Sequence, residues 1–326
     1  MEETMTLSTE IDYELYNIDG IELVFDSSAK DQLCYTIRQA GACTTWMCTN
    51  CVYQFFDRIS CAPTIMNIVL AQPQQHIIDI GCHIGTHSLP LARYGHTVTA
   101  IDGSSDSIAC LEKAKESNNF SNITTIQAVL SNAEYSCTFN PKSLSWSSMN
   151  NEQDTNLEYT TTTLDKLLSL DSCDAIKINV EGYEKEVLEG AVKTINKFYP
   201  MLMIEIDNYL LHIRDIKCNE IFTLLAEMGY DVLQPSLSTD LKNLNLREIN
   251  PLDMYPVGIG YIVAVHKANR RTTQWFPPFS PEELQQQLQH SYDPQSPFKD
   301  YLQSLMYHDI INKVDKKYKD RDELPD

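Results

Sequence analysis

Acidic and amide side chains lie at the ends of two predicted strands in the second half of the sequence. Residues 174–180, DAIKINV, alternate between two faces at period two, so that Asn179 lies on the polar face and Glu181 follows directly. The next apolar run, MLMIEID, carries Glu205 and Asp207 in the same alternation. Ligands of open α/β sheets bind beyond the carboxyl ends of the strands, so these four side chains are predicted to converge on one polar site. Such a site could orient a hydroxyl group and accept its proton.

A lysine shares the polar face of the first of these strands. Lys177 precedes Asn179 by two residues, and a charged side chain in a central parallel strand is costly unless it is paired. The position therefore predicts either an ion pair, with Glu181 as one candidate partner, or a polar site at the end of the strand. The four oxygen-bearing side chains would also suit magnesium. They equally suit plain hydrogen bonding, and we predict no metal.

A glycine turn links an apolar run to a predicted helix in the first half of the chain. Residues 77–80, IIDI, are typical of a buried parallel strand that contains Asp79 and stops at Gly81. Gly81 and Gly85 enclose three residues and let the backbone approach a ligand closely, and a helix is predicted over 86–94. The turn therefore predicts a small-molecule site at the open edge of the sheet.

The strand that follows ends on an acid. Residues 97–101 are predicted to form it, and Asp102 comes 21 residues after Gly81. An acid at about this distance can accept hydrogen bonds from the hydroxyls of a ribose. His83, inside the glycine turn, is a candidate base, although it could instead bond a backbone carbonyl.

The glycine spacing excludes one class of nucleotide site. A pyrophosphate needs G-x-G-x-x-G at a helix start, and that pattern is missing here, which weighs against a nicotinamide dehydrogenase. The wider Gly81-x-x-x-Gly85 turn is typical of S-adenosylmethionine sites, where a zwitterionic methionine replaces the pyrophosphate.

The remaining pattern predicts a doubly wound α/β sheet. A third strand is expected over 123–130, helices over 104–118, 184–198 and 220–228, and a final antiparallel strand over 258–266. Three parts follow from this: an N-terminal cap region (1–75), a nucleoside-binding domain (76–266) and a C-terminal docking tail (267–326) rich in proline, glutamine and aromatic residues. In the cap, a strand or hairpin is expected over 18–25 and helices over 31–40 and 46–59. The polar stretch 140–157 is predicted to be an exposed loop, either over the substrate or a plain surface insertion.

Charge and composition limit which binding partners and which cellular location can be expected. The formal net charge of −20 argues against a nucleic-acid partner. The acidic N-terminus has no apolar core of a secretory signal, and no apolar run reaches membrane-spanning length, so we expect a cytoplasmic protein without membrane contact. Ten cysteines are expected to be reduced thiols. The cluster Cys43, Cys48, Cys51 and Cys61 could be half of a zinc site, but small buried residues are the favoured interpretation because a second ligand pair is missing.

Two motifs resemble a known family. IIDIGCHIGTHS and DAIKINVEGYEKEVLEGA, with TLDKLL before the second and MIEI after it, resemble the FkbM-type S-adenosylmethionine-dependent methyltransferases over residues 76–207. The resemblance implies a class I methyltransferase sheet of seven strands, the last antiparallel, and O-methylation of a sugar or polyketide-like hydroxyl. It implies that Asp79, Gly81 and Gly85 frame the methionine end of S-adenosylmethionine and that Asp102 holds its ribose.

The same resemblance places the transferred methyl group near Asn179 and Glu181. Several residues depart from the family pattern. Asn179 stands where Asp is usual, and Ser131-Asn132 stands where Ser-Asp often meets the adenine. Asn132 keeps its hydrogen-bonding ability and is predicted to bind the cofactor, whereas an amide at 179 cannot take a proton.

These observations predict an S-adenosylmethionine-dependent methyltransferase acting on a hydroxyl of a small molecule or glycan. Glu181 and His83 are the predicted bases, with Asn179 beside them. The alternative is a catalytically weak regulatory protein that has kept the cofactor-binding fold.

Overall fold

The structure is a computed structural model of the 326-residue chain. It describes residues 13–18, 21–26, 74–139, 157–207, 210–211, 214–237, 244–248, 259–269 and 275–276. Several sequence predictions lie outside these residues: the helices at 31–40 and 46–59, the cysteine cluster from Cys43 to Cys61, the polar loop before residue 157, and most of the C-terminal tail.

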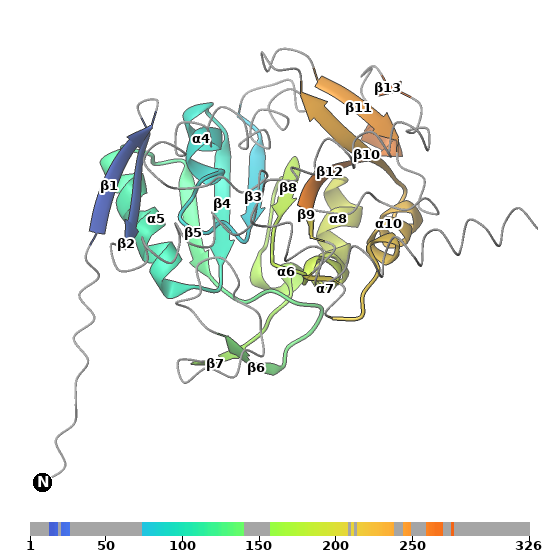
Figure 1. Ribbon diagram of the computed structural model, residues 1–326, viewed down its shortest axis with the longest axis horizontal. Helices are drawn as coiled ribbons and strands as arrows, with labels where there is room; N and C mark the ends of the chain where they lie inside the picture. Colours follow the sequence, from blue (N-terminus) through green and yellow to red (C-terminus); the bar gives the residue numbers. More distant parts are fainter. Residues whose placement is uncertain are drawn as a thin grey trace, which may run out of the picture.

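A nine-stranded mixed sheet organises the described chain (Figure 1). Five parallel strands occupy one side in the order β5-β4-β3-β8-β9, and β12 then runs antiparallel between β9 and β10. The strands are β3 (His76–Ile80), β4 (Thr97–Asp102), β5 (Ile123–Gln127), β8 (Ala175–Ile178), β9 (Met201–Asp207), β10 (Tyr230–Leu237), β11 (Leu244–Glu248), β12 (Ile259–His266) and β13 (Trp275–Phe276). Seven of these strands lie side by side in the order β5-β4-β3-β8-β9-β12-β10. They confirm the predicted seven-stranded sheet, in which β12 is the antiparallel strand.

Two short strands extend the sheet beyond the predicted seven. β11 pairs antiparallel with β10, and β13 pairs in parallel with β11. The predicted third strand is too long at its end, because β5 stops at Gln127 and Leu130 pairs instead with Thr162 in an isolated bridge.

Helices connect the parallel strands. They are α4 (Ser88–Arg93), α5 (Ser105–Ser117), α6 (Leu164–Leu167), α7 (Glu184–Glu189), α8 (Val192–Phe198) and α10 (Cys218–Glu227), and the short 3-10 helix η3 (Lys267–Asn269) follows β12. Ser104 caps α5 as predicted, since its hydroxyl accepts the Ser107 N–H at 3.2 Å.

The single helix predicted over 184–198 is wrong. The chain forms two helices, α7 and α8, that are separated at Gly190. A Cβ at Gly190 would lie 2.1 Å from the Ser131 carbonyl oxygen, so the backbone passes closer to its neighbour than any other residue allows. The amphipathic pattern of the sequence continues through Gly190, so it does not predict the break between α7 and α8.

Two antiparallel hairpins stand outside the main sheet. One pairs β1 (Tyr13–Ile18) with β2 (Ile21–Asp26), which refines the strand or hairpin expected near residues 18–25, and it lies beside α5 (Figure 1). The other pairs β6 (Ser136–Phe139) with β7 (Leu157–Thr160).

The two faces of the sheet differ in chemistry. On one face, buried isoleucines of β3, β8 and β9 pack against α7, α8 and α10 in an apolar core that includes Ile80, Ile178 and Ile204. Because successive strand residues point to opposite faces, Asp79, Lys177, Glu205 and Tyr261 project from the other face. Polar groups therefore gather on one face of the sheet, close to the carboxyl ends of its parallel strands.

Candidate active site

The glycine turn after β3 is tightly packed against its neighbours. Gly81, His83 and Gly85 all have left-handed backbone angles, with φ of 70°, 52° and 91°. A Cβ at Gly81 would lie 1.7 Å from the Asn179 carbonyl oxygen, and one at Gly85 would lie 2.3 Å from the Leu111 side chain. Both glycines are therefore required by contacts within the protein, in addition to any approach to a ligand.

Asp102 fixes the same turn from the end of β4. One carboxylate oxygen accepts the His83 N–H at 2.9 Å and the other accepts the Ser104 N–H at 2.8 Å. Burial raises the pKa of Asp102, and the two backbone bonds oppose this shift. Each carboxylate oxygen has a second lone pair, so the side chain can still accept hydrogen bonds from two adjacent hydroxyls.

Asp79 lies beneath the turn in a buried polar network. The Lys177 ammonium lies 2.9 Å from one Asp79 oxygen and donates to the Gly81 carbonyl at 2.7 Å, while the Ser88 hydroxyl donates to the other Asp79 oxygen at 2.6 Å. Burial acts to raise the pKa of Asp79, but Lys177, His87 and Ser88 outweigh it and the pKa is lowered. The ion pair expected for Lys177 is present, with Asp79 as the partner instead of Glu181. Asp79 thus supports the turn indirectly, through the Lys177 ammonium that bonds the Gly81 carbonyl.

The second turn, between β8 and α7, presents Glu181. Glu181 and Gly182 have φ of 54° and 95°, so two consecutive residues are left-handed. The Glu184 carboxylate accepts the N–H groups of Val180 at 3.1 Å and Gly182 at 3.2 Å, which closes the turn from inside.

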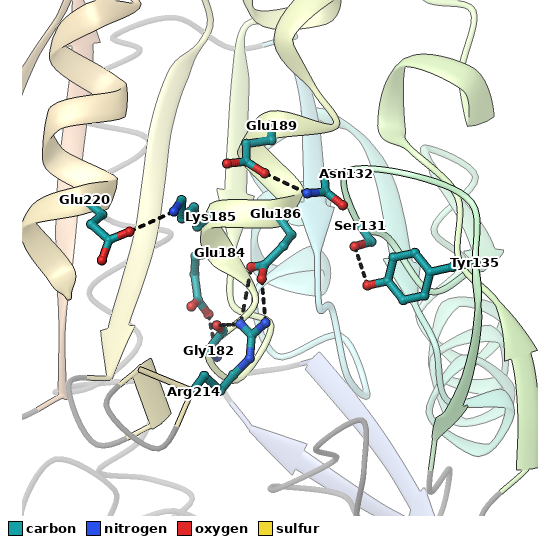
Figure 2. Close-up of polar contacts among 10 residues, drawn as sticks. All are labelled: Ser131, Asn132, Tyr135, Gly182, Glu184, Lys185, Glu186, Glu189, Arg214 and Glu220. Atoms are coloured by element: carbon teal, nitrogen blue, oxygen red, sulfur yellow. Dashed lines mark hydrogen bonds and ion pairs between the residues drawn. The ribbon is translucent and has the colours of Figure 1, made fainter. Parts of the chain in front are cut away.

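An arginine closes this turn from outside. Figure 2 shows Arg214 facing both the Gly182 carbonyl and the Glu186 carboxylate of α7, and the Arg214 Nη2 to Glu186 Oε1 distance is 2.5 Å. The guanidinium carbon also lies 3.4 Å from the centre of the Tyr183 ring. Arg214 and Glu184 together therefore contact four residues of the turn and its helix, namely Val180, Gly182, Tyr183 and Glu186.

The acids around this turn have raised pKa values. Burial, followed by the charges of Glu205, Asp207 and Glu184, raises the pKa of Glu181 well above its usual range. Burial also raises the pKa of Glu184 and of Glu205 to about 7. Glu181 therefore holds its proton more tightly than an ordinary glutamic acid does, and its role as the base stays a prediction.

The predicted base in the glycine turn is also a weak one. Burial lowers the pKa of His83 to about 4, so its imidazole is neutral at physiological pH. Its Nε2 is buried and makes no hydrogen bond within the part of the chain that the structure describes. A neutral ring with one such nitrogen is suited to hydrogen bonding a ligand group.

Asn132 lies at the far end of the site on an exposed segment. Its side-chain amide donates to Glu189 of α7 at 2.8 Å, and the neighbouring Ser131 hydroxyl lies 2.7 Å from the Tyr135 hydroxyl (Figure 2). The amide oxygen of Asn132 is not involved in the Glu189 bond, so the predicted cofactor contact is compatible with this arrangement.

Comparison with known families identifies the domain that contains these groups. Residues 79–232 match the family described as Methyltransferase FkbM domain. This part of the chain is an FkbM methyltransferase domain. It has the class I methyltransferase sheet, and the methyl donor of the family is S-adenosylmethionine, as the sequence predicted.

Individual relatives are distant from this chain. A stretch of 61 residues, 19% of the chain, is 34% identical to an uncharacterized protein of Haemophilus influenzae and covers only 23% of that protein. A solved FkbM methyltransferase from Methylobacillus flagellatus is 16% identical, with a TM-score of 0.38 over 73% of this chain and 59% of that one. Magnesium protoporphyrin IX methyltransferase from Synechocystis, solved with S-adenosylhomocysteine, is 14% identical, with a TM-score of 0.42 over 74% of this chain and 95% of that one.

The residues of the FkbM domain fit its methyl donor at the ribose end. Asp102 stands at the end of β4 with acceptor capacity left on both oxygens, beside a turn whose backbone it holds. Within the described residues, no helix is long and apolar enough to cross a membrane, and no three His, Cys, Asp or Glu side chains are grouped as a metal site would require.

Sequence reasoning missed three supports of the FkbM site. Ser88 bonds Asp79 beneath the first turn, and Glu184 and Arg214 bond the second turn, but none of the three was singled out. Glu184 follows the V-E-G motif by two residues, so its position after a glycine turn was the available signal. Arg214 lies 32 residues beyond Gly182, and no local pattern could connect the two.

Proposed function

We propose that this protein transfers a methyl group from S-adenosylmethionine to a hydroxyl oxygen of a small molecule or sugar. The observation that carries the proposal is the polar face at the carboxyl ends of β8 and β9, where three acids with raised pKa values, Glu181, Glu184 and Glu205, adjoin the glycine turn. Groups that ionise near neutral pH suit the removal of a proton from a hydroxyl as it is methylated.

S-Adenosylmethionine, when bound, supplies an electrophilic methyl group whose bond to sulfur breaks with its electron pair remaining on sulfur. The chain's own residues would bind, align and exclude water. Asp102 would accept the ribose hydroxyls, the turn of Gly81 and Gly85 would frame the methionine end above Asp79, and Asn132 would bond the adenine.

The acceptor would enter on the side of the β8–α7 turn. His83, Asn179 and Glu181 would line the place of transfer, with the side-chain amide of Asn179 donating a hydrogen bond to an acceptor oxygen. The formal net charge of −20 disfavours a nucleic-acid acceptor, so we propose a small molecule or glycan.

The proposal is tested by incubating the purified full chain with S-adenosylmethionine labelled in its methyl group and a panel of sugars, polyketides and phenols. We expect label to appear in at least one hydroxylated acceptor as a base-stable ether. Binding of S-adenosylhomocysteine without transfer to any member would contradict the proposed activity and favour the regulatory alternative.

A further inference from the structure

Glu205 lies on β9, on the same face of the sheet as Lys177 of β8 and Tyr261 of β12. Lys177 of β8 pairs with Met203 of β9, and Glu205 of β9 pairs with Tyr261 of β12. One step beyond Lys177 along the same face, Asn179 reaches the level of Glu205 and donates its side-chain amide to the Glu205 carboxylate. The carboxylate therefore lies in a row of polar groups that spans β8, β9 and β12.

We propose that Glu205 is the base that takes the proton of the acceptor hydroxyl. This inference rests on the proposed methyl transfer. As the hydroxyl oxygen forms its bond to the methyl carbon, its proton passes to a Glu205 carboxylate oxygen, and the proton is later released to water. Asn179 acts as a positioning residue that donates to the other oxygen of Glu205 and leaves one oxygen for the acceptor.

The charges around Glu205 support this assignment. Burial raises its pKa to about 7, with the Lys177 ammonium acting against this shift. A base with a pKa near the working pH is effective because enough of it is ionised and its ionised form is still basic. The charged or titratable groups that face it are Lys177 of β8, Glu181 and Glu184 of the β8–α7 turn and helix, Asp207 of β9 and Tyr261 of β12.

The neighbouring groups are less suited to this role. Burial and the neighbouring acids raise the pKa of Glu181 well above its usual range, so it holds its proton tightly, and His83 with a pKa of about 4 is a much weaker base. One oxygen of Glu184 is committed to the backbone N–H groups of Val180 and Gly182. Glu205 thus takes the place that the sequence alone assigned to Glu181 and His83.

The amide side chain of Asn179 affects how Glu205 ionises. A carboxyl at this position would share a proton with Glu205, because two adjacent carboxylates resist being ionised together. The amide of Asn179 cannot ionise and instead favours the charged form of Glu205 through its hydrogen bond. Asn179 therefore adds no further carboxyl to the acids that surround Glu205.

The decisive experiment compares the full-length protein with its Glu205→Gln, Asn179→Asp and Glu112→Gln variants. Glu112 lies on α5 and serves as a control for the substitution itself. We expect Glu205→Gln to lower turnover by about 100-fold or more and to abolish the acidic limb of the pH profile, with S-adenosylhomocysteine affinity unchanged. We expect Asn179→Asp to move that limb upward by about one pH unit. Retention of the limb in Glu205→Gln would overturn the proposal.

A second readout needs neither acceptor nor turnover. In protein with carbon-13 in its glutamate side-chain carboxyls, the signal lost in Glu205→Gln is expected to titrate near pH 7 and to move upward in Asn179→Asp. Titration below pH 5 would overturn the assignment of Glu205. If no acceptor is methylated but this signal titrates near pH 7, the proposed activity fails while the proton-accepting character of Glu205 stands.

Discussion

The two turns of the site, Gly81–Gly85 after β3 and Asn179–Tyr183 after β8, have similar backbones but are held by different means. Both contain left-handed residues that are not glycine, His83 in one and Glu181 in the other. The first turn is held by Lys177, which bonds both the Gly81 carbonyl and the Asp79 carboxylate, and by Asp102, which accepts the His83 N–H. The second is held by Glu184, whose pKa is about 7, and by Arg214.

This difference fits the two tasks that we propose for the turns. The first turn would bind the cofactor above the buried ion pair of Lys177 and Asp79. The second would lie beside the proton transfer, among acids whose pKa values are raised. One residue connects the two, because Lys177 donates to the first turn from the strand that leads into the second.

Replacement of Lys177, which connects the two turns, is expected to have the largest effect on stability. Lys177→Met leaves the Asp79 carboxylate buried without its partner and is expected to lower the free energy of unfolding by about 3–5 kcal/mol. Urea denaturation measures the loss. Lys185→Met is the matched control, since its pair with Glu220 is partly exposed and is worth about 1 kcal/mol or less. Equal losses in the two variants would contradict the structural role of Lys177.

The first turn alone is broken by Asp102→Ala. The change removes the predicted ribose contact and leaves the N–H groups of His83 and Ser104 without their acceptor. We expect S-adenosylmethionine and S-adenosylhomocysteine to bind about 100-fold more weakly, measured by calorimetric titration. The control variant Asp106→Ala, at the N-terminal end of α5, is expected to bind S-adenosylmethionine and S-adenosylhomocysteine normally. Unchanged binding in Asp102→Ala would remove this residue from the cofactor site.

The second turn alone is altered by Glu184→Gln. Because the pKa of Glu184 is raised from 4.5 to about 7 in the folded state, the native protein holds this proton more tightly than the unfolded chain. The contribution of Glu184 to the free energy of unfolding should therefore be greatest below pH 4.5 and decline as the pH rises to about 7. The glutamine variant keeps the acceptor oxygen for Val180 and Gly182, and its stability difference between pH 5 and pH 8 should shrink by up to about 3 kcal/mol. Parallel stability curves for wild type and variant would show that Glu184 does not titrate in this range.

The smallest effect is expected from Arg214→Lys. Lysine keeps the positive charge but loses the planar group that contacts Gly182, Glu186 and Tyr183 together. We expect turnover to fall about 10-fold through misplacement of the second turn, with the dissociation constant of S-adenosylhomocysteine within about twofold of wild type. A weakened cofactor affinity with normal turnover would reverse the proposed division between the turns.

The sequence predicted the parallel strands and the first turn well because their signals are local. A run of three isoleucines around Asp79, followed by glycine, located β3, and the period-two pattern of β8 placed Lys177 on the polar face. The partner of Lys177 was misassigned, because Asp79 lies 98 residues earlier and only the register of β3 with β8 brings the two together. The roles of Glu184 and Arg214 also depend on how separate segments pack, and the shift of the Glu181 pKa depends on burial among other acids. No single stretch of sequence carries that information.

The bond between Asn118 and Glu22 has a consequence for the N-terminal hairpin. The Asn118 side chain accepts the Glu22 N–H at 2.8 Å and donates to the Glu22 carbonyl at 2.7 Å. A carboxamide has the same donor and acceptor as a peptide group, so Asn118 acts as a one-residue surrogate strand on the edge of β2. The hairpin is thus fastened to the end of α5, the helix that begins beside Asp102. Removal of the hairpin would leave the Asn118 amide, among the described residues, with only its bond to the Ala114 carbonyl of the same helix.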